Sequence, residues 1–211
     1  MDRATAVDAR SGQWVLYVFS DDAQRLRHAK GNPEEANTAS DYPSDLPKFQ
    51  LDQNLRNTKQ IHVLAQRFTN NPTRSAGPDG APVELVEVGD PDRAEKDVSR
   101  ALHRLIREDG VSPRDMAVLT GRSRVRSQFG PDTSTIGTFA VTSNAFVEPD
   151  KSLLDTAWRF KGLERPAVIL CELEDYLDND ALLHAAITRA RLRLIVIGSS
   201  ETIARMSTVD G

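Results

Sequence analysis

Four short apolar runs constrain the fold of this chain more than any other feature. They are Met116–Leu119, Leu153–Leu154, Ala167–Cys171 and Leu194–Ile197, and segments of helical or loop character separate them. Runs that are this brief and this continuously apolar are typical of parallel strands buried on both faces of a sheet. Because such strands alternate with helices, the sequence predicts an α/β domain.

Two helices and one further strand are expected ahead of these runs. Asn57, a residue type that favours helix N-caps, precedes a short stretch with apolar residues at helical spacing. The run Val83–Val88 nearly alternates apolar and polar residues, which indicates a strand. The clearest helix begins near Asp92: apolar residues recur on one helical face as far as Ile106, and Gly110 closes it.

Composition bounds the class of protein. The 211 residues suffice for one full domain and a smaller appendage, and 39% hydrophobic with 27% charged residues is ordinary for a water-soluble globular chain. The net charge of -4 gives no basic surplus, so any nucleic-acid contact requires a local strip of Arg and Lys. Cys171, the single cysteine, is expected to be a buried small hydrophobe.

The chain is expected to be cytoplasmic, with no membrane partner. Its start lacks the pattern of a signal peptide, and no apolar stretch approaches the length of a membrane span. The first segment contains the strand-like run Trp14–Phe19, and a polar stretch rich in Pro and Asn follows it. We therefore divide the chain into residues 1–29, a linker at 30–50, and the main domain at 51–211.

The stretch from Thr156 to Glu164 lies between two strand-like runs and carries polar groups suited to a ligand. Ligands of open α/β sheets bind at the carboxyl ends of strands, where we expect this stretch to lie. Thr156 and Lys161 can hold phosphate oxygens, Gly162 permits a positive φ, and Glu164 can accept hydrogen bonds from a ribose hydroxyl. Taken alone, the stretch is equally consistent with an ordinary surface loop.

A second stretch, Leu182–Arg191, reads as an alanine-rich helix that brings Arg189 toward its end. Arginine suits the stabilisation of a transferring phosphoryl group because its guanidinium stays ionised and presents a planar fork of donors. A lone arginine is more often structural. Arg191 and Arg193 are consistent with plain solvated side chains.

Together, the two stretches resemble helicase motifs V and VI of the UvrD/Rep group of superfamily 1. The matching patterns are Thr-x-x-x-x-Lys-Gly-Leu-Glu, from Thr156, and Thr-Arg-Ala, from Thr188. Upstream, Leu51–Ile61 resembles motif IV of the same family, and Phe19–Gln24 resembles motif III. The acidic residues ahead of Gln24 fit a degenerate motif II, the Mg²⁺-binding motif, less well.

The resemblance implies a RecA-like (P-loop NTPase-type) three-layer fold, with a mainly parallel sheet and helices on both faces. Residues 51–211 would be the second RecA-like domain of an ATP-dependent DNA helicase, and residues 1–29 a remnant of the first. The short separation of Arg56 from Lys161 leaves no room for the large subdomain inserted there in long UvrD-like enzymes, so this would be a compact relative.

The resemblance also assigns roles to residues at an ATP cleft between two domains. It implies that Arg56 and Arg189 reach the γ-phosphate, that Gln24 links this phosphate to DNA, and that Glu164 and Gly162 contact the nucleotide, Glu164 at its ribose.

A second group of residues would contact single-stranded DNA. The resemblance places Thr156 and Lys161 at the DNA backbone. Trp158 stands where relatives often carry His, and it offers either a stacking face for a base or an ordinary core or interface tryptophan. DNA as the substrate and 3′-to-5′ movement are the family's default, and a bacterial chain would be nucleoid-associated.

Departures from the family pattern limit what the chain can do alone. None of its 12 glycines is followed by lysine, so the phosphate-binding loop of the family is absent. ATP and Mg²⁺ are therefore cofactors of a complete motor, and we expect neither tight binding nor hydrolysis by this chain without an N-terminal RecA-like half or a partner ATPase. The histidines are not spaced as metal ligands, which predicts no metal site.

Two other interpretations stay open. The chain is, alternatively, a degenerate or truncated module without catalysis that binds DNA or a partner protein, which the missing phosphate loop favours. The third interpretation, an unrelated small α/β nucleotide-binding or nuclease-like fold, requires the ordered motif matches to be accidental.

Overall fold

The computed structural model describes residues 3–7, 14–18, 52–90, 93–144 and 148–207. Within these ranges the strands are β1 Arg3–Val7, β2 Trp14–Val18, β3 Gln53–Asn54, β4 Arg74–Ser75, β5 Glu84–Glu87, β6 Met116–Thr120, β7 Thr135–Ile136, β8 Phe139–Thr142, β9 Ser152–Thr156, β10 Arg165–Cys171 and β11 Ala190–Gly198. The helices are α1 Lys59–Gln66, α2 Glu95–His103, α3 Asp180–Ile187 and α4 Ser200–Ser207.

The centre of the described chain is a seven-stranded sheet with the order β5-β11-β10-β6-β9-β8-β7. Every neighbouring pair in it is parallel except β7 and β8 at one edge. The four apolar runs that the sequence marks as parallel strands form β6, β9, β10 and β11, so this prediction is confirmed. Each is buried over most of its length, which explains why the runs are continuously apolar.

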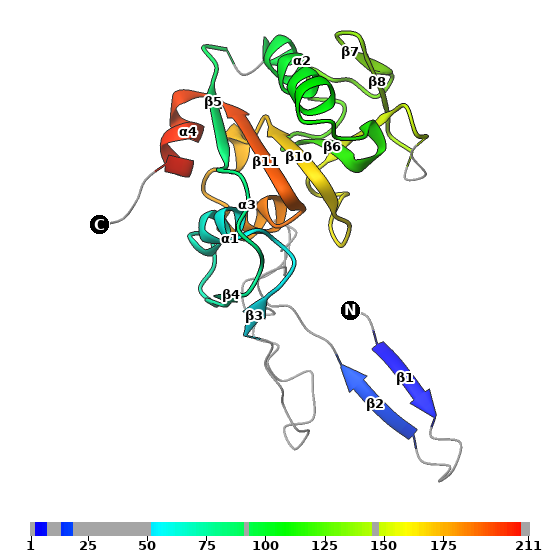
Figure 1. Cartoon of the computed structure of the whole chain (residues 1–211), viewed down its shortest axis with the longest axis vertical. Helices are drawn as coiled ribbons and strands as arrows, with labels where there is room; N and C mark the ends of the chain where they lie inside the picture. Colours follow the sequence, from blue (N-terminus) through cyan, green and yellow to red (C-terminus); the bar gives the residue numbers. More distant parts are fainter. Residues whose placement is uncertain (1–2, 8–13, 19–51, 91–92, 145–147, 208–211) are drawn as a thin grey trace.

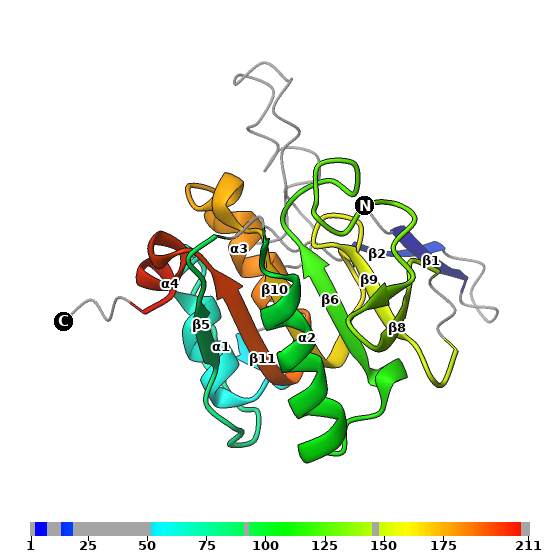
Figure 2. The ribbon, with the colours of Figure 1, turned by 90° about the horizontal axis from the view of Figure 1, so that it is seen from above.

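Helices cover both faces of this sheet. Residues of α1, α3 and α4 share one apolar cluster with alternate sheet residues such as Val168 and Leu170. Residues of α2 share the other cluster with Ile169 and Cys171 on the opposite face of the same strand. Figures 1 and 2 show α2 on one side of the sheet and α1 with α3 on the other. The expected RecA-like three-layer α/β fold is therefore confirmed.

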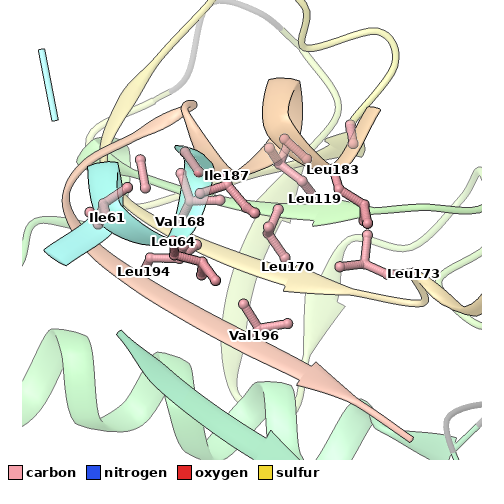
Figure 3. Close-up of a cluster of buried hydrophobic side chains, with 14 of the residues drawn as sticks. Ile61, Leu64, Leu119, Val168, Leu170, Leu173, Leu183, Ile187, Leu194 and Val196 are labelled. Atoms are coloured by element: carbon pink, nitrogen blue, oxygen red, sulfur yellow. The ribbon is translucent and has the colours of Figure 1, made fainter. Parts of the chain in front are cut away.

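One of the two apolar clusters holds α1 and α3 against the sheet. Figure 3 shows Leu64 of α1 and Ile187 of α3 close to Val168 and Leu194 of the sheet. These side chains are at most 7% exposed. Burying one Leu or Ile of this kind stabilises the fold by roughly 2 kcal/mol, so the cluster fixes α1 and α3 firmly against β10 and β11.

The helix that follows β5 departs slightly from the regular pattern. The helix expected from Asp92 is α2, and it continues as a π-helical turn over Arg104–Glu108. Gly110 closes it at φ 68°, as expected, because this left-handed conformation favours glycine.

The expected N-terminal strand is present as β2. It pairs antiparallel with β1 in a two-stranded sheet that is separate from the seven-stranded one. Gln24 and the expected linker at 30–50 lie outside the described residues, so the assignment of residues 1–29 stays a prediction.

None of the helices in the described ranges is both long enough and apolar enough to cross a membrane.

Candidate functional site

A short turn ahead of α1 presents Arg56. The side-chain oxygen of Asn54 accepts hydrogen bonds from the backbone N–H groups of Arg56, at 2.9 Å, and Asn57, at 3.0 Å. The Asn54 amide also donates to the Asn57 side-chain oxygen at 2.9 Å. Asparagine favours such turns because its side chain bonds to the backbone two or three residues on. The turn is therefore fixed locally, and the Arg56 side chain emerges from it 48% exposed.

Asn57 joins this turn to the segment between α3 and β11. Its side chain is fully buried, and Nδ2 donates to the carbonyl oxygens of Thr188, at 3.1 Å, and Ala190, at 2.5 Å. The expectation that Asn57 caps the following helix is wrong. Thr58 occupies the N-cap position, without a side-chain capping bond, and the Asn57 side-chain oxygen, the atom that could cap, accepts from Asn54 instead.

The loop at Gly77 packs directly on this junction. A Cβ atom added at Gly77 would lie 2.0 Å from the carbonyl oxygen of Asn57, so only glycine fits there. The backbone N–H of Thr58 also donates to the Arg191 carbonyl oxygen at 3.0 Å. Three separate segments therefore hold one another in register at this end of α1.

Arg56 and Arg191 converge on the carboxylate of Glu164. Arg56 Nε lies 3.1 Å from Glu164 Oε2, and Arg191 Nε lies 3.5 Å from Glu164 Oε1. The side chains are 48%, 51% and 39% exposed, respectively, so a ligand in solvent can reach all three. The segments that resemble motifs IV, V and VI thus meet at one carboxylate, and Arg191, interpreted as solvated from the sequence, is part of the cluster.

Arg189, by contrast, is buried. The residue is 1% exposed, just after α3 ends. Its Nε donates to the Ala185 carbonyl oxygen at 2.7 Å, Nη1 to that of Leu163 at 3.1 Å, and Nη2 to the Thr188 hydroxyl at 3.3 Å. In this conformation its guanidinium holds the turn at Leu163 in place. The contact of Arg189 with phosphate stays a prediction, and it requires these three hydrogen bonds to break.

The turn from Thr156 to Glu164 runs from one end of the sheet to the other. Thr156 ends β9 and pairs with Thr120, the last residue of β6, whereas Glu164 immediately precedes β10. Thr156 is therefore at the carboxyl end, as expected. The expectation that the whole stretch lies there is wrong, because Glu164 lies at the amino end.

Gly162 adopts φ 85° in this turn, which confirms the expected positive φ. A Cβ atom at this position would meet nothing within 4 Å, so the requirement for glycine comes from the backbone conformation alone.

Of the residues expected at DNA, Thr156 lies at the carboxyl end of the sheet, and Trp158 and Lys161 follow it in the turn toward Glu164. Thr156 is 6% exposed, and its hydroxyl accepts a hydrogen bond from the backbone N–H of Arg159 at 3.1 Å. Trp158 is half-buried, and Lys161 is exposed. Arg159 pairs with Asp155 at 3.3 Å. In this arrangement Lys161 is the most accessible of the three predicted DNA contacts, and Thr156 is the least.

A basic segment that the sequence reasoning missed follows β6 at this same carboxyl end. Arg122, Arg124 and Arg126 alternate along it, and Arg122 and Arg126 both pair with Asp175. Burial lowers the pKa of Arg124, while the Asp155 carboxylate opposes that shift. The Arg-x-Arg-x-Arg pattern directly after an apolar run was the available signal. Of these arginines, Arg126 has the more exposed side chain, at 62% against 18% for Arg122, and the shared Asp175 carboxylate offsets part of their charge.

The site suits an anionic ligand better than a metal ion. Exposed guanidinium groups at Arg56 and Arg191 are donors for phosphate oxygens. Within the described ranges, no group of three or more His, Cys, Asp or Glu residues is arranged to hold a metal ion. These residues therefore fit the nucleotide half of an ATP–Mg²⁺ complex and do not fit the Mg²⁺ ion.

Comparisons with known proteins bear on the fold. No protein-family model matches the sequence, and no curated protein matches it. Solved structures do match: the C-terminal domain of a possible DNA helicase from Lactobacillus plantarum WCFS1 aligns with a TM-score of 0.57. The alignment covers 74% of this chain and 93% of that domain, at 20% sequence identity. The chain shares the fold of this domain.

Proposed function

We propose that residues 51–211 form the second RecA-like domain of an ATP-dependent, UvrD-like superfamily 1 DNA helicase or translocase. One observation carries the proposal: three segments that resemble motifs IV, V and VI meet at Glu164 through Arg56 and Arg191. A chance resemblance gives no reason for the segment of Arg56 to meet those of Glu164 and Arg191, both more than 100 residues away in sequence, in one exposed ionic cluster. The shared fold with a domain described as part of a possible DNA helicase supports the same conclusion.

In this proposal the two ends of the sheet have different tasks. The amino end, with Arg56 and Glu164, faces the nucleotide held by an N-terminal RecA-like domain, and Glu164 accepts hydrogen bonds from the ribose. Arg56, together with Arg189 once its present hydrogen bonds break, stabilises negative charge on the phosphates as the terminal phosphoryl group transfers to water. Gln24 belongs to the N-terminal side of this cleft.

The turn that begins at the carboxyl end contacts the backbone of single-stranded DNA through Thr156 and Lys161, with Trp158 offering a face for a base. Arg122 and Arg126 add positive charge there. Because the turn from Thr156 to Glu164 spans both ends, closure of the cleft on nucleotide shifts the DNA contacts with it. Repeated closure and opening then moves the domain along the strand.

Binding of a fluorescein-labelled single-stranded oligothymidylate by the whole chain tests the DNA contact. Fluorescence anisotropy across a series of salt concentrations should show affinity that falls steeply as salt rises. The Lys161→Ala variant should reduce the slope of log affinity against log salt by about 0.7, since one phosphate contact on a single strand is lost.

Lys96 on α2 provides a matched control, because it is exposed and α2 packs on the opposite face of the sheet from α1. The Lys96→Ala variant should bind like the unmodified chain. Equal salt slopes for Lys161→Ala and Lys96→Ala would contradict the assignment of Lys161. Absence of any DNA binding by the unmodified chain would favour the other candidate, a module that docks on a protein.

A further inference from the structure

The region around Glu164 carries more positive charge than one carboxylate can balance. Four arginine guanidinium groups contact the two residues Leu163 and Glu164. Arg56 and Arg191 bind the Glu164 carboxylate, Arg165 donates to the Glu164 backbone oxygen at 3.0 Å, and Arg189 donates to the Leu163 backbone oxygen at 3.1 Å. Like charges held this close repel, and a ligand with more than one negative charge relieves that repulsion better than Glu164 does.

The four arginines differ in what they can offer a ligand. Arg189 is 1% exposed and donates to backbone and hydroxyl oxygens of its own chain. Arg165 is half-buried, with its guanidinium 5.8 Å from the centre of the Phe160 ring. Arg56 and Arg191 have about half of their side chains in solvent, and each contacts one oxygen of the same carboxylate. Arg56 and Arg191 can therefore reorient toward an incoming anion without breaking the hydrogen bonds that hold the turn at Leu163.

We propose that Arg191 is a second anion-binding arginine beside Arg56, and that the Glu164 carboxylate holds both guanidinium groups until a phosphate-bearing ligand takes its place. The ligand class is a di- or triphosphate, whose neighbouring phosphate groups present oxygens to two guanidinium forks at once. Displaced from the arginines, the carboxylate becomes available to accept hydrogen bonds from the rest of a nucleotide. This inference deepens the proposed function and rests on it for the identity of the ligand.

The backbone supports this pairing of Arg56 with Arg191. The Thr58 N–H donates to the Arg191 carbonyl oxygen at 3.0 Å, and Asn57 donates to the carbonyl oxygen of Ala190, the neighbouring residue, at 2.5 Å. Arg56 and Arg191 therefore lie on two backbone segments that are hydrogen-bonded to each other. Their separation is set by the fold and not by their mutual contact with Glu164.

Titration of the whole chain with inorganic pyrophosphate tests the proposal directly. With ¹⁵N-arginine labelling, the Nε–Hε signals of Arg56 and Arg191 should shift together and give one dissociation constant. Arg191→Ala and Arg56→Ala should each weaken binding by roughly tenfold, the value of one charge-assisted hydrogen bond. Glu164→Gln should tighten it several-fold, because the competing charge is removed while the shape is kept.

Arg100 on α2 serves as the control, since it is an exposed arginine paired with a carboxylate, that of Asp97, away from the cluster. Arg100→Ala should leave pyrophosphate affinity unchanged. Unchanged affinity in Arg191→Ala would overturn the proposal, as would weaker binding in Glu164→Gln. Arg191→Lys, which keeps the charge and loses the fork, should retain part of the affinity, and full loss in a folded Arg191→Lys variant would also count against it.

The outcome is separable from that of the proposed function. If pyrophosphate binding depends on Arg191 but the chain binds no DNA, the result would support the anion site and contradict the helicase assignment. If the chain binds DNA but Arg191→Ala binds pyrophosphate with normal affinity, the result would support the proposed function and contradict the anion site.

Discussion

The amide nitrogen of Asn57 lies 2.5 Å from the carbonyl oxygen of Ala190, and this bond joins segments 133 residues apart in sequence. The same amide bonds to Thr188, so Asn57 holds the backbone on both sides of Arg189. Because Arg56 precedes Asn57 and Arg191 follows Ala190, the geometry of the ionic cluster depends on this buried side chain.

Replacing Asn57 should therefore destabilise the domain more than its size suggests. Asn57→Ala leaves two buried carbonyl oxygens without donors and should lower the free energy of unfolding by about 2–3 kcal/mol. Asn57→Asp should cost more, since a carboxylate cannot donate and would face both carbonyl oxygens. Urea unfolding followed by circular dichroism measures both values. The exposed Asn71→Ala is the control, and its stability should change by no more than about 0.5 kcal/mol.

Arg189 and Arg191 should differ sharply in their effect on stability. Arg189→Ala removes donors from the Ala185 and Leu163 carbonyl oxygens inside the protein and should cost roughly 2–4 kcal/mol. Arg191→Ala removes one exposed ion pair and should cost less than about 1 kcal/mol. Equal costs, measured by urea unfolding, would contradict the buried position of Arg189.

Gly162 should tolerate no ordinary side chain without strain. Its φ of 85° costs an L-residue roughly 1–2 kcal/mol, although a Cβ atom would touch nothing. Gly162→Ala should lower the free energy of unfolding by that amount, and Gly162→Asn by less. Gly89 has equally open space without a positive φ, so Gly89→Ala should be neutral or slightly stabilising. A neutral Gly162→Ala would argue against the left-handed turn.

Cys171 should make stability depend on alkaline pH. Burial, followed by the charges of Glu172 and Glu174, raises the pKa of its thiol well above the usual range. A group whose pKa is higher in the folded state stabilises the fold fully below its unfolded pKa and loses that contribution as pH rises past it, here from about pH 8.5.

The free energy of unfolding of the unmodified chain should therefore fall above about pH 8.5 more steeply than that of Cys171→Ala, by up to roughly 1.4 kcal/mol per pH unit. Parallel curves for the two proteins would contradict a buried thiol.

The sequence predicted the sheet well because its signal is local. The apolar runs that become β6, β9, β10 and β11 are buried on both faces, and burial of that kind leaves a direct mark on composition. The strands β3 and β4 went unnoticed because two residues each carry no periodicity, and the exposed residues of α4 weaken its helical pattern.

The sequence singled out Arg56 and Glu164 as candidate site residues, and their functional roles stay predictions, but it did not indicate which side chains contact each other. Motif spacing identified Arg56 and Glu164, yet a sequence cannot distinguish a buried arginine such as Arg189 from an exposed one such as Arg191. That difference arises from tertiary packing, as does the use of the Asn57 amide across the domain and not as a helix cap. The basic segment after β6 was visible in the sequence, but its position beside Thr156 follows only from strand order.

ATP hydrolysis by the chain combined with an N-terminal RecA-like helicase domain, with and without single-stranded DNA, distinguishes a helicase motor domain from a non-catalytic module. The mixture should show DNA-stimulated hydrolysis that neither part shows alone, that falls by at least roughly a hundredfold in Arg56→Ala, and that is unchanged in Arg100→Ala. A mixture no faster than the N-terminal domain alone, or an Arg56→Ala variant as active as the unmodified chain, would contradict the assignment as a motor domain.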